Sequence, residues 1–113
     1  MPSGYSNVVV LGRLAANPFV DATHEVKIAR VTVAVPRSYK DKTGNYIEHV
    51  DNVECVAFAS KAEICQNYLS KGAAVCLVGH IHVDEKVNEA GLTRVFQSIV
   101  IDNVVFMSSG VQR

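Results

Sequence analysis

Residues 58–72, which read FASKAEICQNYLSKG, decide the fold of this chain. Their pattern predicts one short helix. Ser60 and Glu63 have the Ser-x-x-Glu spacing of a capping box, in which each side chain satisfies a backbone N–H at the helix start. Gly72 stands where a helix end favours a left-handed residue, and Lys71 is expected to complement the negative end of the helix dipole. Because the rest of the chain is patterned as strands, a single helix restricts the choice of fold sharply.

Segments of strand character lie on both sides of this helix. We expect five strands, at residues 7–14, 27–35, 50–58, 74–83 and 93–106. The second strand alternates, with Val31, Val33 and Val35 on one face. In the third, Val53, Cys55 and Ala57 share one face, whereas Asn52, Glu54, Val56 and Phe58 share the other. Polar residues 36–49 and 84–91 are expected to form two long hairpin loops.

Three strands, a helix and two strands follow the order of the OB-fold. We therefore predict an all-β protein, a five-stranded OB-fold barrel with one α-helix between strands 3 and 4. The sheet face and hairpin loops of such barrels bind oligonucleotides or oligosaccharides. We expect one domain over residues 1–107 and a frayed tail at 108–113. Tyr68, on the helix, is expected to pack against the barrel, and Phe19 and Phe106 are expected to belong to the core.

The composition limits the possible functions but does not select one of them. The 113 residues contain 11 Lys and Arg against 11 Asp and Glu, so the net charge is zero. This neutrality argues only weakly against a nucleic-acid partner, because binding depends on local clusters of charge. The chain has an odd number of cysteines, namely Cys55, Cys65 and Cys76, and they show no C-x-x-C spacing. We expect all three to be reduced. With no signal-peptide pattern or long apolar run, we expect a cytoplasmic protein.

Aromatic and basic residues gather on the first predicted hairpin. Tyr39 lies among Arg37, Lys40 and Lys42, and Tyr46 follows on the same hairpin. Single-stranded nucleic acid needs both kinds of group, since cations contact phosphates while aromatic rings stack on unpaired bases. A solvated hairpin with incidental charge is the alternative.

Two phenylalanines are also in phase with polar residues rather than with the predicted core. Phe58 shares a face with Asn52 and Glu54, which favours a binding surface over core packing. The alternative for Phe58 is a residue at the barrel end covered by a loop. Phe96, in phase with Arg94 and Ser98, supports the same interpretation.

The sequence contains only weak candidates for catalytic or metal-binding motifs. His80 and His82 point to one face of a strand, but no third ligand is placed near them, and zinc sites take three or four protein ligands. Asp84 and Glu85 are expected to lie in a solvated hairpin. The sequence has no nucleophile elbow, phosphate-binding loop or dinucleotide-binding motif. We therefore expect no enzyme activity and no cofactor.

Several segments together resemble the bacterial single-stranded DNA-binding protein family. They are NVVVLGRL at residues 7–14, VTVAVPRSYKDKTG at 31–44, YLSKG at 68–72 and IDNVVFM at 101–107. The resemblance implies an OB-fold that forms a homotetramer, or else a dimer. It also implies that the protein binds single-stranded DNA in replication, recombination and repair, alongside proteins of those processes. The sequence ends at Arg113 without the family's long flexible region and acidic tip. The resemblance therefore implies either the core of a longer protein or a divergent, tailless member.

Carried onto this sequence, the resemblance places stacking rings at Tyr39 and Phe58, and phosphate contacts at Lys42, Lys71 and, more loosely, Arg13. It also marks departures: Asn52 and Lys86 stand where the family carries aromatic residues, and Glu54, His82 and Asp84 stand at positions that are basic in the family. The residues that we expect to contact DNA are Arg13, Arg37, Tyr39, Lys40, Lys42, Tyr46, Phe58, Lys71, His82, Lys86, Arg94 and Phe96.

Two functions remain open. The first is non-enzymatic, sequence-tolerant binding of single-stranded DNA. The second is an OB-fold adaptor of the primosomal type, which acts mainly through protein–protein contacts and binds DNA weakly. Net neutrality and the missing aromatic residues favour the second, whereas Tyr39, Phe58 and the basic hairpin favour the first.

Overall fold

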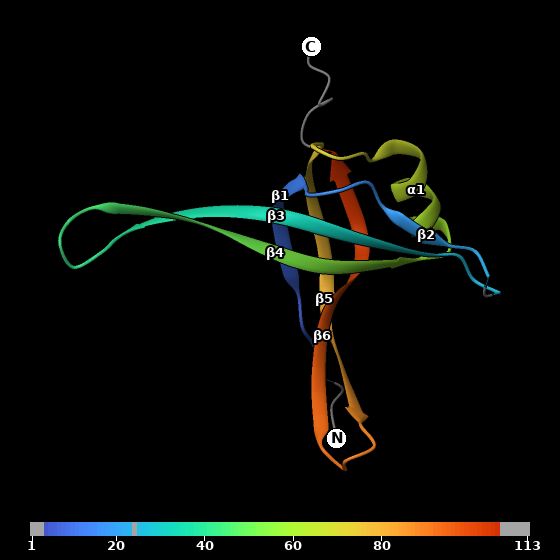
Figure 1. Ribbon diagram of the computed structural model, residues 1–113. Helices are drawn as coiled ribbons and strands as arrows, with labels where there is room; N and C mark the ends of the chain where they lie inside the picture. The colour runs from blue at the N-terminus through green and yellow to red at the C-terminus, as the bar shows by residue number, and fades with distance from the viewer. Residues whose placement is uncertain (1–3, 24, 107–113) are drawn as a thin grey trace.

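The computed structural model describes residues 4–23 and 25–106, without the side chain of Phe106. The predicted tail at 108–113 and the predicted core position of the Phe106 ring therefore lie outside the described part. The elements, in chain order, are β1 (Val8–Leu14), β2 (Phe19–Asp21), β3 (Ile28–Lys40), β4 (Tyr46–Phe58), α1 (Ser60–Tyr68), β5 (Ala74–Val87) and β6 (Thr93–Phe106) (Figure 1). No helix among the described residues is long and apolar enough to span a membrane.

The strands close into a barrel. Their order is β1-β5-β6-β4-β3-β2, and β1 also pairs with β3 at Arg13 and Leu14. At Gly12 an added Cβ would lie only 2.3 Å from the carbonyl oxygen of Ala34, so a glycine is needed for β1 to approach β3 this closely. The predicted five-stranded OB-fold is confirmed, with the helix between the third and fourth long strands. The short strand β2, at the edge of β3, was not predicted.

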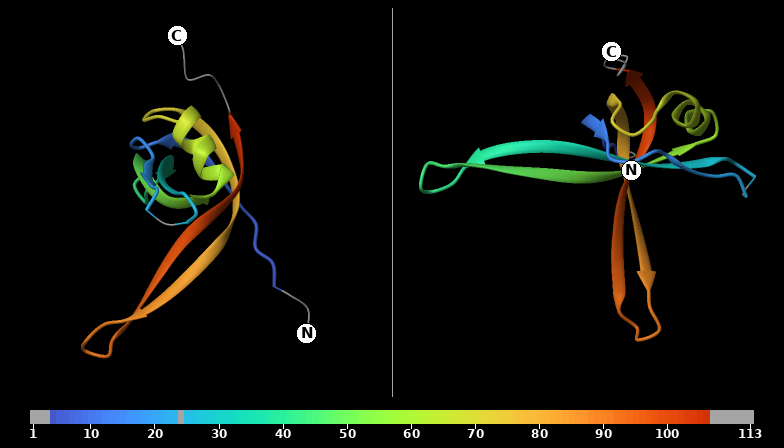
Figure 2. Two further views of the ribbon diagram at one scale, coloured as in Figure 1. Left: turned by 90° about the vertical axis from the view of Figure 1, so that its right-hand side faces the viewer. Right: turned by 45° about the horizontal axis from the view of Figure 1, so that its top comes forward.

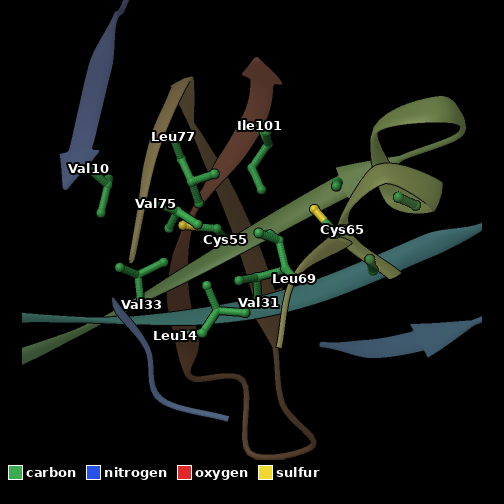
Figure 3. Packing of buried hydrophobic residues seen from close by; sticks show 13 residues of the cluster. Val10, Leu14, Val31, Val33, Cys55, Cys65, Leu69, Val75, Leu77 and Ile101 are labelled. Atoms are coloured by element: carbon green, nitrogen blue, oxygen red, sulfur yellow. The ribbon is translucent and has the colours of Figure 1, made fainter. Parts of the chain in front are cut away.

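The core is apolar and fills the inside of the barrel. Val31 and Val33 of β3, Val75 and Leu77 of β5, and Cys55 of β4 are fully buried there (Figure 3). Their alternation along each strand is the one expected from the sequence. Burying a side chain of this size contributes roughly 1.5–3 kcal/mol each, which holds the barrel together.

Two long ribbons extend from the barrel in different directions. The β3–β4 ribbon extends to the left and the β5–β6 ribbon downward in Figure 1, and both project beyond the core in the right-hand view of Figure 2. The predicted hairpin loops were too long, because β3 and β4 continue into the first and β5 continues into the second, which leaves residues 41–45 and 88–92 as turns. The last strand begins at Thr93, as predicted. Asp84 and Glu85 consequently lie in β5 and not in a hairpin loop. Ile81 and Val83 are exposed on this ribbon, although they are in phase with the buried part of β5.

The helix lies where the sequence predicts it, but its ends differ from the prediction. Ala59 is the N-cap residue and no side chain caps the helix start, so the predicted capping box is wrong. The helix ends at Tyr68, and its last turn carries no basic residue. Gly72, with φ of 89°, belongs to the turn that follows, where Ala73 donates a backbone hydrogen bond to Ser70. Lys71 is therefore too far from the helix to complement its dipole.

Candidate nucleic-acid interface

Five strands each place one side chain in a row across the outside of the barrel. Register pairs Phe19 with Arg30, Arg30 with Val56, Val56 with Val100 and Val100 with His80. Directly paired residues stand on the same face of a sheet. Both chain neighbours of Arg30 are fully buried, so these five residues face away from the core cluster, although Val56 in the middle of the row is itself only 9% exposed. With neighbouring strands about 4.8 Å apart, the row spans roughly 19 Å. We call it the outer row.

A cleft of about 290 Å³ lies beside the outer row, where the two ribbons separate. In the described strands β4 and β6 are paired at Cys55–Ile99 and Val56–Val100, and the ribbons diverge beyond this point (Figure 1). The cleft is lined by Arg30, Glu54, Cys55, Val56, Asp84, Lys86, Phe96, Gln97 and Ser98. It therefore joins the outer row to the β5–β6 ribbon.

The acidic residues of the cleft have polar partners, whereas its cations have no anionic partner among the described residues. Glu54 accepts a hydrogen bond of 3.0 Å from the Thr32 hydroxyl. Asp84 and the His82 ring are 3.1 Å apart. Arg30 and Lys86 form no ion pair within the described part of the chain. The cleft can therefore offer cationic groups to an anion, although its formal charges balance.

The predicted residues of the β5–β6 ribbon come together around one ring. The Lys86 ammonium and the Arg94 guanidinium each lie 5.8 Å from the centroid of Phe96, within cation–π range. Lys86 is paired with Arg94 across the ribbon, and the Phe96 side chain is 48% exposed. A base stacked at this ring would bring its phosphates close to the two cations.

Phe58 also faces outward, as its alternation predicts. It lies two residues beyond Val56 on β4, is paired with Ile28 and is 42% exposed. The alternative of a ring covered by a loop is wrong. Phe58 is thus available to a ligand on the same face as the outer row.

The predicted residues of the β3–β4 ribbon divide between its two faces. Lys40 and Tyr46 are paired, and the Lys40 ammonium lies 5.3 Å from the centroid of the Tyr46 ring. Tyr39 is paired with Ile47 and occupies the opposite face. On that face Arg37 contacts Asp51 at 2.9 Å, so part of its charge is neutralised. Tyr39 and Tyr46 cannot form one stacking surface locally.

The tip of this ribbon is held by Asp41. Its carboxylate accepts hydrogen bonds from the Thr43 hydroxyl and from the backbone N–H groups of Thr43 and Asn45, at 2.7–3.0 Å. The Thr43 hydroxyl bond is the main cause that holds the pKa of Asp41 below its ordinary value. The exposed Lys42 is presented at this ordered tip, where a phosphate could reach it.

Arg13 and Lys71 lie together, at the turn that precedes β5. Arg13 donates a hydrogen bond of 2.9 Å to the carbonyl oxygen of Gly72, and the backbone N–H of Lys71 donates one of 2.8 Å to Asn17. Neither residue belongs to the outer row or to the cleft. Any DNA contact that they make would be separate from the stacking rings.

The surroundings of the histidines and cysteines bear on metal binding and on the reactivity of the thiols. His80 lies 3.0 Å from Asp102, and no group of three potential metal ligands occurs among the described residues. Burial is the main cause that raises the pKa of the Cys55 thiol to about 12, with smaller effects of Glu54 and Cys65. Burial alone raises the pKa of Cys65 to about 11. Since the thiolate is the reactive form, neither thiol is an available nucleophile.

Two residues of the outer face, Phe19 and Arg30, were missed by the sequence prediction of the site, and the packing of Tyr68 on the helix was also predicted wrongly. Phe19 was assigned to the core but is 66% exposed, because the unpredicted strand β2 turns it outward. Tyr68, also expected to pack, is 70% exposed. Arg30 was not among the predicted contacts, although the alternation of Val31 and Val33 already placed it on the outside. Its signal was therefore present in the sequence.

Comparison with known proteins points to one family. The model of the Single-strand binding protein family matches residues 5–107. Single-stranded DNA-binding protein B of Bacillus subtilis (strain 168) is 32% identical over 104 residues, which cover 91% of this chain and 90% of that protein. Single-stranded DNA-binding protein 2 of Streptococcus pyogenes serotype M18 is 29% identical over 109 residues, which cover 96% of this chain but 66% of that protein.

A solved structure shares the fold. The Plasmodium falciparum SSB in complex with ssDNA superposes with a TM-score of 0.81 at 16% sequence identity, and the match covers 96% of this chain and 99% of that one. At this identity the likeness supports the barrel and the arrangement of its ribbons.

Proposed function

This chain belongs to the single-strand binding protein family, and from that premise we propose that its outer face binds single-stranded DNA without enzymatic chemistry. Phe58 and Phe96 stack on unpaired bases, while the cations near them contact phosphates. The observation that carries the proposal is the Phe96 ring, exposed beside the cleft with Lys86 and Arg94 within cation–π range. Stacking tolerates any base, since every base has a π-face, so binding is sequence-tolerant.

The remaining predicted contacts take supporting roles in this proposal. Residues 1–107 form the DNA-binding domain. Lys40, Lys42 and Tyr46 extend the interface along the β3–β4 ribbon, with Arg37 and Tyr39 on its other face. His82 lies beside the cleft, and Arg13 and Lys71 contact DNA that leaves the barrel. The protein protects or organises single strands in the cytoplasm during replication, recombination and repair, together with the proteins of those processes.

We also propose that the chain acts as a homotetramer. Val9 and Leu11 of β1 are more than half exposed, and Leu11 borders an almost wholly apolar groove of about 520 Å³. The groove is lined by Leu11, Gly12, Arg13, Ala34, Pro36, Val50 and Ala74. One edge of β1 pairs with β5, while among the described residues its other edge meets β3 only at Arg13 and Leu14. An open strand edge beside an apolar groove suits a second copy of the chain.

A fluorescence-anisotropy titration tests the DNA-binding proposal. The probe is a labelled dT oligonucleotide of about 35 nucleotides, long enough for several OB-fold sites of roughly 4–16 nucleotides each. We expect tight, salt-sensitive binding to the single strand and much weaker binding to a duplex of the same length. Phe58→Ala and Phe96→Ala should each weaken binding by about 1–3 kcal/mol.

Tyr68→Ala is the matched control, because it removes an exposed ring from the helix rather than from the sheet. Its affinity should equal that of the unsubstituted protein. Binding to the single strand that is no tighter than binding to the duplex would contradict the proposal and favour the adaptor function. The acidic Glu54 and Asp84 of the cleft would then be understood as groups that repel DNA.

A further inference from the structure

Phe19 is held on the outer face by the pairing of β2 with β3. Its neighbour Val20 packs against the core, so the alternation of the strand turns Phe19 outward beside Arg30. A slip of one residue would exchange the two side chains and bury the ring. The register therefore fixes a large exposed aromatic side chain at the edge of the barrel, at the end of the outer row.

Arg30 stands between this ring and the cleft, and no described residue forms an ion pair with it. The nearest acidic position on β4 is Glu54, whose carboxylate is hydrogen-bonded to Thr32. On β2, Asp21 accepts hydrogen bonds from the backbone and hydroxyl of Thr23. Arg30 itself forms no ion pair within the described residues, and it lines the cleft. A guanidinium in this setting is suited to two-point binding of a phosphate.

We propose that Phe19 and Arg30 form an additional nucleotide subsite, in which the Phe19 ring stacks on a base and the Arg30 guanidinium binds an adjoining phosphate. This inference rests on the proposed function and extends the interface from Phe96 across the outer row to the edge strand β2. Single-stranded nucleic acid is the occupant that fits, because it alone presents an unpaired base and a phosphate together along one chain. An aromatic ring on β2 also offers a face on which a base can stack. The side chains of Asn52 and Lys86, which stand at positions that are aromatic in the family, offer none.

A tryptophan substitution gives a direct readout of this subsite. The chain contains no Trp, so the emission of a Phe19→Trp variant reports this one position. We expect its fluorescence to be quenched when dT oligonucleotide is added, reaching a plateau when anisotropy of the labelled oligonucleotide shows saturation. Tyr68→Trp is the matched control and should not be quenched. Unchanged Phe19→Trp emission at saturation would overturn the subsite while leaving the proposed function intact.

Affinity measurements test the two roles separately. Phe19→Ala should weaken dT binding about tenfold, as expected for the loss of one stacked base. Arg30→Gln should lower the slope of log K against log salt by about 0.7, the value for one phosphate contact on a single strand. Lys61→Gln removes the same charge from the helix and should leave the slope unchanged. Equal slopes for Arg30→Gln and the unsubstituted protein would refute the phosphate contact.

A failure of the whole proposed function would give a different result from a failure of the subsite alone. In that case the unsubstituted protein would give no preferential anisotropy change with the single strand. Circular dichroism and thermal unfolding establish that each variant is folded, and truncation at an exposed ring is expected to change stability little. A loss of binding by a folded Phe19→Ala variant therefore supports the subsite.

Discussion

Ala59 has a backbone conformation that side-chain-bearing residues rarely adopt. Its φ is 54° and its ψ is −122°, at the point where β4 ends and α1 begins. The conformation is held because its N–H donates to the Lys27 carbonyl and its own carbonyl accepts from Glu63. It also explains why the capping box fails, since Ser60 is already helical and cannot act as the N-cap. Such a residue costs of order 1–3 kcal/mol.

Replacing Ala59 with glycine should stabilise the protein. Glycine adopts positive φ without the clash of a Cβ, although it adds freedom to the unfolded chain, so we expect a net gain of about 1 kcal/mol. Urea unfolding followed by circular dichroism measures it. Gly72→Ala, at φ of 89°, is the reverse change and should destabilise by a similar amount. An Ala59→Gly variant that unfolds at lower urea than the parent would show that no strain is stored there.

Outward-facing residues could be predicted only where a strand is long enough to show its period. Phe58 and Arg30 sit in long strands whose buried valines and cysteine define the inner face, so alternation places both outside. Phe19 sits in a strand of three residues, which is too short for any periodicity. Its exposure depends on tertiary pairing with β3, and no local pattern in the sequence encodes that pairing.

At the scale of elements, the barrel strands, the helix and the full length of β6 were predictable, whereas the outer parts of β3, β4 and β5 were not. The barrel strands have one face on a core and therefore alternate between apolar and polar residues. The outer parts of β3, β4 and β5 have solvent on both faces and no buried apolar face, so they were interpreted as loops, although they carry exposed apolar residues such as Ile47 and Val87. The turns themselves were recognisable, since Gly44 and Gly91 have positive φ at the two tips.

The length of the ribbons matters for the interface. Because β5 and β6 remain paired as far as Val87 and Thr93, the cations Lys86 and Arg94 are held opposite each other. In a flexible loop they would lose conformational freedom on binding DNA, whereas a paired ribbon presents them in place. This end of the proposed interface is therefore a paired ribbon, and not a loop that must fold around its ligand.

At the scale of the whole molecule, the net charge is zero, but the surface has two regions of different chemical character. Aromatic and unpaired basic side chains gather along the outer row and the cleft, while β1 presents an apolar face with an open strand edge. The first surface suits DNA and the second suits another copy of the chain. A sum of charges over the sequence could not separate them, because each depends on which strands meet.

The proposed homotetramer can be tested at the apolar face. We expect the protein in solution to have about four times the chain mass of 12.3 kDa, as measured by sedimentation equilibrium. Leu11→Asp should lower this mass, because it places a charge in the groove that a second copy would cover. Val87→Asp adds the same charge at the far end of a ribbon and should leave the mass unchanged. A parent protein that sediments as a monomer would contradict the proposed assembly.

The central claim is that single-stranded DNA lies on the outer face, and photocrosslinking tests it most directly. A dT oligonucleotide is irradiated in complex with the full chain, and the crosslinked residues are identified by mass spectrometry. We predict crosslinks at Phe58 and Phe96, together with Phe19 at the edge of the outer row. Crosslinks confined to Tyr5 and Tyr68, with none at these three phenylalanines, would place the DNA elsewhere and contradict the account.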